Sequence, residues 1–263
     1  MLFDTHAHLN DAQFDQDREE VIRRAREEFD VRYILNIGYN KASILSTLEL
    51  IEQYDFIYAA VGWHPHDAVS CTPKDLEWIR SLTEHPKVVA IGEIGLDYYR
   101  HYAPKERQQD VFRQQIQLAR EVNLPIIIHN READADIIQI LQEEKAEEVG
   151  GIMHCFSGNI ERMKQYLAFN FLIGLGGIAT FKNAKSVHEV AKQVPLDALV
   201  VETDCPYLAP HPYRGKRNES GYVRFVAERI AELRNITLEA LAEKTTENAK
   251  RLLKIGSSEK EGF

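Results

Sequence analysis

The sequence has few cysteines and no long hydrophobic run. Its three cysteines, Cys71, Cys155 and Cys205, form an odd set without CxxC spacing, which is typical of reduced thiols rather than a disulfide framework. No apolar stretch approaches the roughly 20 residues of a membrane-spanning helix. A signal peptide is not expected either, because Asp4 falls where its apolar part should begin. These absences predict a cytoplasmic protein with no membrane partner.

An excess of basic charge is also missing. The formal net charge is −9, whereas proteins that bind nucleic acid over a whole face are usually basic. Any polyanion must therefore be held locally, by bound cations and a few Lys or Arg side chains. The sequence contains no internal repeat, low-complexity segment or linker, and its apolar share of 44% is enough for a substantial core.

Short apolar runs rich in β-branched residues recur along the chain. They span residues 2–6, 31–37, 56–61, 88–93, 124–129, 151–154, 171–175 and 199–204. Helical periodicity is found at 17–29, 43–54, 73–82, 104–122, 134–144, 160–168, 184–194, 221–233 and 238–253. Strands that alternate with helices indicate a parallel sheet, and eight such units predict a closed (β/α)8 TIM barrel.

The alternative to a barrel is an open, doubly wound sheet. Such sheets commonly carry a Gly-rich GxGxxG fingerprint after the first strand, and this sequence has none there. We therefore predict an α/β fold with a single TIM-barrel domain over residues 1–256. Residues 257–263 are polar, and we expect a frayed tail there.

Metal-ligating residue types follow several of the apolar runs. These residues are His6, His8, Glu93, His129, His154 and Asp204. Alternate residues of an extended chain point to the same side, so His6 and His8 aim two imidazoles at one point. Each residue alone has an ordinary explanation, such as a surface acid or a core histidine. Chance gives no reason for such residues at the same end of five strands, where barrel enzymes place their chemistry, so we predict a divalent-metal site.

Alternation also predicts the neighbours of these ligands. Asp4 and Glu202 lie two residues before His6 and Asp204, so they should share the inward face. A lone carboxylate inside a barrel is costly, and a hydrogen bond to the free nitrogen of a ligand histidine removes much of that cost. We therefore predict that Glu202, and also Asp4, support the ligand histidines. By the same alternation, Cys155 and Cys205 should point the opposite way, toward the helices, as small core residues.

Three further loops should lie on the same face of the barrel. One carries two histidines, one an aromatic residue beside an arginine, and one a dense basic run. Aromatic and guanidinium groups can stack on bases, although ordinary loop packing or a solvated charge run explains the same residues. The candidate substrate-binding residues are His64, His66, Tyr98, Arg100, Arg214, Lys216 and Arg217.

The assembled motifs resemble the TatD family of metal-dependent deoxyribonucleases, within the amidohydrolase-like barrels. They are FDTHAH at 3–8, GWHP at 62–65, GEIGLD at 92–97, IH at 128–129, HCFSG at 154–158, ETDCP at 202–206 and RGKRNE at 214–219. The resemblance runs from Met1 to about Leu253. Ser220 departs from it, because the family usually has Pro there, and we expect a looser start to the next helix.

The resemblance implies a dinuclear centre. One ion would be held by His6, His8, Glu93 and Asp204, and the other by Glu93, His129 and His154, with Glu93 as the bridge. It also implies a DNA substrate, single-stranded or at strand ends, and a nuclease that trims those ends. Imidazole and carboxylate ligands accept zinc, manganese, magnesium or nickel, so the metal stays open.

The residues by themselves argue for metal-assisted hydrolysis. Two ions about 4 Å apart can generate hydroxide and stabilise the attacking and leaving oxygens. Asp204 would act as general base, with Glu93 as the second catalytic carboxylate. Taken together with what the resemblance implies, the leading hypothesis is an exo-type deoxyribonuclease. The alternatives are an ester, lactone or amide hydrolase, such as an aminoacyl-tRNA ester deacylase, and a non-enzymatic metal-binding protein, which an open ligand set without thiolates disfavours.

Overall fold

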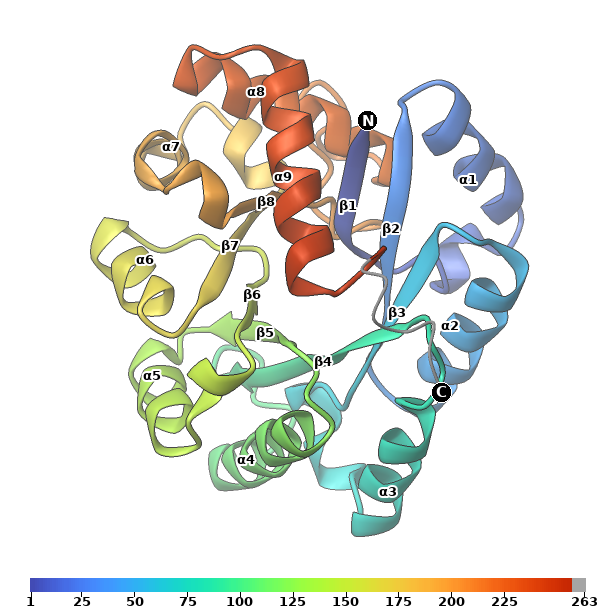
Figure 1. Ribbon diagram of the computed structural model, residues 1–263, viewed down its shortest axis with the longest axis vertical. Helices are drawn as coiled ribbons and strands as arrows, with labels where there is room; N and C mark the ends of the chain where they lie inside the picture. Colours follow the sequence, from blue (N-terminus) through green and yellow to red (C-terminus); the bar gives the residue numbers. More distant parts are fainter. Residues whose placement is uncertain (257–263) are drawn as a thin grey trace.

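Parallel strands form the centre of the molecule (Figure 1). The computed structural model describes residues 1–256, so the predicted frayed tail at 257–263 lies outside the described residues. The eight-stranded sheet runs in sequential order. Its strands are β1 (Leu2–Ala7), β2 (Val31–Gly38), β3 (Ile57–Val61), β4 (Val88–Asp97), β5 (Ile126–Arg131), β6 (Gly151–Met153), β7 (Phe171–Leu175) and β8 (Leu199–Val201).

The sheet closes on itself between its first and last strands. Ala7 forms a parallel bridge with Cys205, and the Asp204 amide donates a hydrogen bond of 2.9 Å to the carbonyl of His6. The predicted (β/α)8 barrel is thereby confirmed as a single α/β domain. The carboxyl ends of all strands meet at one mouth, which is where a barrel positions functional side chains.

Helices surround the sheet (Figure 1). They are α1 (Arg18–Glu27), α2 (Lys41–Gln53), α3 (Pro73–Leu82), α4 (Lys105–Glu121), α5 (Asp134–Glu143), α6 (Ile160–Leu167), α7 (Lys185–Gln193), α8 (Val223–Arg234) and α9 (Leu238–Leu252). Local sequence explains several helix starts. Thr72 caps α3 in a reciprocal pair with Asp75, and Pro73 occupies the first helical position. Thr237 caps α9 by accepting a bond from the Ala240 amide.

Two apolar cores hold these layers together. The larger one fills the space between the sheet and the surrounding helices. The smaller one fills the barrel interior with residues such as Phe3, Leu35 and Ile127, and it extends to Ala249 and Leu253 at the end of α9. This apolar filling makes the barrel a solid support beneath the mouth.

Six carboxyl-terminal strand ends differ from the sequence prediction, and those of β4, β5, β6 and β8 matter for the mouth. β4 continues to Asp97 and β5 to Arg131, because the two strands remain paired out to those residues. β6 and β8 instead stop at Met153 and Val201. Positive φ angles of 48° at Cys155 and 59° at Asp204 end the extended conformation there.

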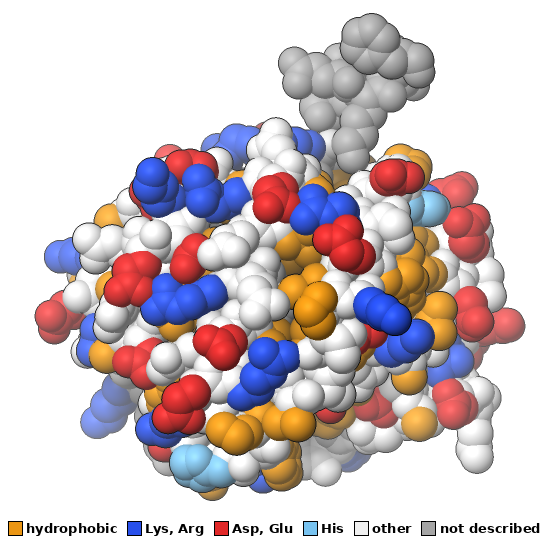
Figure 2. Space-filling view, turned by 90° about the horizontal axis from the view of Figure 1, so that it is seen from below, with side chains coloured by type: hydrophobic (Ala, Val, Ile, Leu, Met, Phe, Trp, Pro, Cys, Tyr) orange, Lys and Arg blue, Asp and Glu red, His pale blue; other side chains and the backbone are white. Residues whose placement is uncertain are grey.

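The outer surface carries charges of both signs. On the face shown in Figure 2, acidic and basic side chains are interspersed among polar and apolar ones. Among residues 1–256, no helix is long and apolar enough to cross a membrane.

Candidate metal centre

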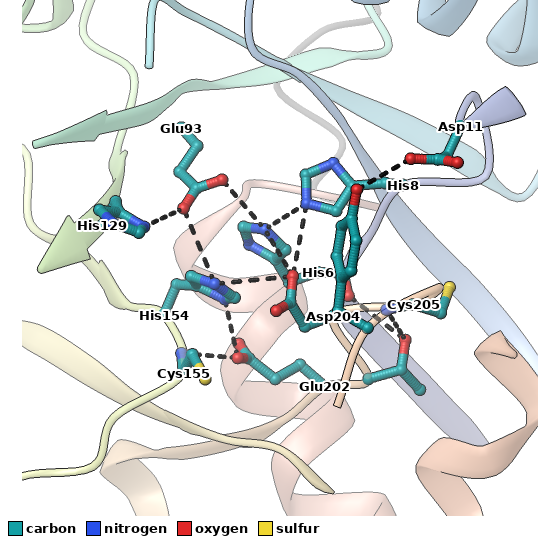
Figure 3. A network of polar contacts seen from close by, with 12 residues as sticks. His6, His8, Asp11, Glu93, His129, His154, Cys155, Glu202, Asp204 and Cys205 are labelled. Atoms are coloured by element: carbon teal, nitrogen blue, oxygen red, sulfur yellow. Dashed lines mark hydrogen bonds and ion pairs between the residues drawn. The ribbon is translucent and has the colours of Figure 1, made fainter. Parts of the chain in front are cut away.

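All six predicted ligands meet at the mouth of the barrel (Figure 3). His6 lies on β1, and His8 is the first residue after that strand. Glu93 lies on β4 and His129 on β5. His154 follows β6, and Asp204 follows β8. Five of the six line a cleft of about 550 Å³, namely His8, Glu93, His129, His154 and Asp204. The sixth, His6, lies beneath them and is fully buried.

The spacing of the deepest ligand atoms fits a cation between them. The Nε2 atoms of His6 and His8 lie 3.3 Å apart. His6 Nε2 is 3.4 Å from Glu93 Oε2, and His8 Nε2 is 3.4 Å from Asp204 Oδ1. A tetrahedral ion with bonds of about 2.1 Å places its ligand atoms about 3.4 Å apart. These residues therefore fit a divalent metal ion better than they fit a closed hydrogen-bond network.

Glu93 connects this group to a second one. Its Oε2 faces His6, whereas its Oε1 lies 2.9 Å from His129 Nδ1 and 3.7 Å from His154 Nε2. One carboxylate oxygen toward each group is the arrangement that a bridging ligand requires. Behind His154, Glu202 Oε1 lies 2.8 Å from Nδ1 and accepts a hydrogen bond of 2.6 Å from the Cys155 amide.

The carboxylates give the second group a strong preference for positive charge. Burial opposes protonation of His154, but Glu202 and Glu93 outweigh it and raise the pKa of His154 to about 10. Burial likewise opposes protonation of His129, but hydrogen bonds to Asp97 and Glu93 raise its pKa to about 9. Such a potential favours bound cations, and a metal ion would displace these protons.

Asp97 is a site residue that the sequence analysis did not select. It is almost fully buried, and its Oδ2 lies 2.8 Å from His66 Nε2 and 3.0 Å from His129 Nε2. Its Oδ1 accepts hydrogen bonds from the amides of Tyr99 and Arg100. Strand alternation could have identified Asp97, because it lies four residues after Glu93 and points to the same side when β4 continues to Asp97.

Asp4 has partners other than the predicted ligand imidazole. Its carboxylate accepts bonds from the Thr203 amide at 2.9 Å, the Thr203 hydroxyl at 2.7 Å and the Ser220 hydroxyl at 2.7 Å. Burial raises the pKa of Asp4 to about 7, although these bonds act in the opposite direction. Asp4 thus supports the backbone before Asp204. Ser220 has a defined role in this support and begins a short 3-10 turn, Ser220–Tyr222.

The two cysteines near the site behave differently. Cys205 is buried in the core between sheet and helices, as predicted. The prediction for Cys155 was wrong, because its side chain lines the cleft and its Sγ lies within 4.8 Å of ligand atoms of His154 and Asp204. The left-handed turn at Cys155 ends the alternation on which the prediction rested.

Three of the candidate substrate-binding residues line the cleft, namely His64, His66 and Arg100. The Nδ1 of His64 accepts a hydrogen bond from the His66 amide at 3.1 Å. Tyr98 is not among the cleft-lining residues, and its hydroxyl bonds to Asp136 at 2.5 Å.

The basic loop after β8 is partly engaged elsewhere. Arg217 forms ion pairs with Asp17 at 2.6 Å and Glu219 at 3.3 Å. Arg214 lies over the ring of Phe181, with 4.4 Å between the guanidinium carbon and the ring centroid. Neither these two nor Lys216 lines the described cleft, so their binding role stays a prediction. Arg131, which the sequence analysis did not select, does line it.

Comparison with known proteins gives consistent matches over nearly the whole chain. The family model described as TatD related DNase matches residues 3–254. The uncharacterized metal-dependent hydrolase YabD of Bacillus subtilis is 58% identical and covers 97% of this chain and 100% of its own length. The 3'-5' ssDNA/RNA exonuclease TatD of Erwinia tasmaniensis is 34% identical, with coverage of 97% and 100%. The crystal structure of YJJV, a TatD homologue from Escherichia coli, superposes with a TM-score of 0.90 at 29% identity, covering 97% and 98% of the two chains.

Proposed function

This chain belongs to the TatD family of metal-dependent hydrolases, and on that premise we propose that it is a deoxyribonuclease that trims the ends of single-stranded DNA. The observation that carries the proposal is the pair of ligand groups joined by Glu93 at the mouth of the barrel. A relative that is 34% identical is named a 3'-5' ssDNA/RNA exonuclease, which supports the same class of substrate.

Two divalent ions would occupy the centre. His6, His8, Glu93 and Asp204 would hold one, and Glu93, His129 and His154 the other. When bound, such ions supply a nucleophilic hydroxide and neutralise charge on the phosphoryl oxygens. Zinc, manganese, magnesium and nickel are all compatible with imidazole and carboxylate donors to different degrees.

Asp204 is the candidate general base. Its Oδ1 lies 3.4 Å from His8 Nε2, and its side chain is 15% exposed, compared with 4% for Glu93. Both carboxylates line the cleft, but Asp204 is the more exposed of the two and can therefore reach a water molecule there. Taking the proton of the attacking water would leave Asp204 transiently protonated, ready to return that proton to the leaving oxygen.

His64 is oriented to donate a hydrogen bond to the substrate. Because its Nδ1 accepts the His66 amide, its proton lies on Nε2, which is 3.8 Å from Glu93 Oε1. Burial and the neighbouring His129 hold its pKa well below the usual range, so the ring is neutral. A neutral Nε2–H at this place can stabilise a phosphoryl oxygen without competing for the metal.

The size of the cleft supports cleavage at an end. A volume of about 550 Å³ lies within the roughly 300–1,000 Å³ range of small-ligand sites. Such a cleft suits one end of a flexible strand, whereas a continuous duplex would have to pass across it.

The test is a nuclease assay with purified, metal-supplemented protein. We expect stepwise shortening of a linear single strand and no cleavage of the same sequence closed into a circle. Glu93→Gln, prepared in parallel, controls for contaminating nucleases. Cleavage of the circle would contradict end-trimming, and the absence of DNA cleavage with every metal would contradict the proposed function. An aminoacyl ester in the same screen tests the alternative substrate class.

A further inference from the structure

Three arginines differ from the other arginines of the described chain. Among residues 1–256, only the guanidinium groups of Arg100, Arg131 and Arg214 have neither a hydrogen bond nor an ion pair. All three follow strands at the mouth of the barrel, after β4, at the end of β5 and after β8. An acidic protein has many carboxylates to pair with its arginines, so unpaired guanidiniums at its active mouth require an explanation.

Arg100 and Arg131 share one aromatic support. The guanidinium carbon of Arg131 lies 4.1 Å from the ring centroid of Tyr99, and that of Arg100 lies 5.5 Å from it. A ring face holds a guanidinium by its charge and leaves the N–H donors unused. Both guanidiniums near this ring therefore keep free donors for an anion.

The same two arginines are positioned next to the metal centre by β5 and Asp97. Arg131 lies two residues after His129 on β5, and it pairs in register with Asp97 of β4. Asp97 holds the Arg100 amide with one carboxylate oxygen and lies 3.0 Å from the His129 imidazole with the other. Both arginines line the same cleft as Glu93. An anion bound by them would therefore lie within the substrate cleft, beside the ligand group of His129.

We propose that Arg100 and Arg131, supported by Tyr99, form a binding subsite for the phosphate next to the one being cleaved. The inference rests on the proposed function, since it assumes a phosphodiester at the metal centre. It assigns the substrate class more narrowly, as oligonucleotides with at least two phosphates rather than single-phosphate esters. Arg217, by contrast, is already neutralised by Asp17 and Glu219.

The experiment compares trinucleotides that differ in one charge. In each trimer one linkage is cleavable, and the other is either a normal phosphate or an uncharged methylphosphonate. Isomers with the neutral linkage on either side cover both directions of digestion. Because length and bases are constant, the ratio of kcat/KM for charged and neutral trimers reports the contact to the second phosphate.

The test variant is the double change Arg100→Gln, Arg131→Gln. The matched control is Arg224→Gln, Arg229→Gln, which alters net charge equally on α8, where both arginines pair with glutamates. We expect the wild-type protein and the control to favour the charged trimer by about 10- to 100-fold, as lost charge-assisted hydrogen bonds suggest. The test variant should bring this ratio close to one.

Two results would overturn the subsite. The first is a wild-type ratio retained by the test variant, which would mean that the second phosphate binds elsewhere. The second is an equal loss on both trimers, which would mean that the arginines shape the cleft instead of binding phosphate.

Binding measurements separate this failure from failure of the proposed function. Fluorescence anisotropy of the metal-loaded protein would use trimers whose scissile linkage is a charged, uncleavable methylene phosphonate. A preference for the charged trimer without any DNA cleavage would contradict the nuclease and leave the subsite standing. Cleavage without any such preference would contradict the subsite and leave the nuclease standing.

Discussion

The two halves of the metal centre are built in different ways. The inner half, His6, His8 and Asp204, lies where β1 meets the end of β8, and its side chains are 0%, 7% and 15% exposed. In the outer half, the His154 side chain is 5% exposed, whereas that of His129 is 19% exposed and has Asp97 behind it. Barrel closure thus fixes the inner half, whereas the outer half is supplied by β5 and by the residue that follows β6. We therefore expect the inner ion to bind more tightly and the outer ion to exchange.

The largest effect should come from removing the residue that joins the halves. Glu93→Gln should weaken both ions and abolish detectable turnover, because metal activation of the attacking water is lost. His129→Ala should chiefly empty the outer half. Elemental analysis of the purified variants measures this difference, and two ions at full occupancy in Glu93→Gln would remove its bridging role.

The next effect separates ligation from proton transfer in the inner half. Asp204→Asn should lower kcat by about 10²–10⁴-fold, which is more than its metal occupancy falls, because the amide cannot accept the water proton. Rates measured at saturating metal, alongside metal content, decide the point. Near-normal turnover under those conditions would exclude Asp204 as the base.

Acidity should distinguish the halves directly. The pKa values of about 10 for His154 and about 9 for His129 mean that both rings are protonated at pH 7 before metal binds. Their protonation stabilises the metal-free fold at low pH and is lost as pH rises through 9 to 10. Loading the outer half should release about two protons, so its affinity should fall about 100-fold for each pH unit below 8.

Calorimetry in buffers of different ionisation enthalpy measures this proton release. The inner half should release fewer protons, because burial and the nearby His154 lower the pKa of His6. Binding heats that do not depend on the buffer would contradict the protonated outer half.

A smaller effect concerns Asp97. Asp97→Asn should weaken the outer ion by about 10- to 100-fold, since a carboxylate that orients a ligand histidine is lost, and should leave the inner ion in place. Asp67→Asn is the matched control, because Asp67 also lines the cleft but accepts a bond from Asn40. Competition with a metal chelator should show one weakened step in Asp97→Asn. Equal weakening of both ions would mean that Asp97 stabilises the whole mouth.

The smallest effect lies behind the inner half. Ser220→Ala should cost about 1–2 kcal/mol of unfolding free energy, because buried Asp4 loses one donor. The raised pKa of Asp4, about 7, means that stability falls as pH rises from about 4 to 7. Losing the donor raises this pKa further, so the cost should be larger at pH 8 than at pH 5.

Denaturant unfolding at the two pH values measures this cost. Ser46→Ala on α2 is the control, since its exposed hydroxyl bonds only the carbonyl of Ala42. A penalty in Ser220→Ala that does not change with pH would contradict the ionisation of Asp4.

The barrel and its ligand cluster could be predicted because their signals are local. Alternating strand and helix periodicities predict the sheet order, and His6 and Glu93 end apolar runs of the sequence. The alternation of side chains along a strand predicted which residues face the mouth only where the chain is extended. It failed at Cys155, where a left-handed residue turns the side chain into the cleft, and it missed Asp97 because β4 is longer than its apolar run.

Long-range pairing explains the remaining differences. Asp4 receives its donors from Thr203 and Ser220, far away in the sequence. Arg217 is bound by Asp17, so a loop that is densely basic in sequence is less free in the fold. Arg131 is isolated in the sequence, yet among residues 1–256 its guanidinium has neither a hydrogen bond nor an ion pair. The density of basic residues along the sequence therefore did not indicate which basic side chains lack an ion-pair partner in the described structure.

The closure between β1 and the end of β8 also affects how the protein is made. His6 and Asp204 are brought together by backbone hydrogen bonds between the start and the far part of the chain. During synthesis, the inner ligands emerge first and must wait for Asp204, which leaves the ribosome only after most of the barrel. An ion bound early would find only part of its ligands, so a complete centre can form only near the end of synthesis.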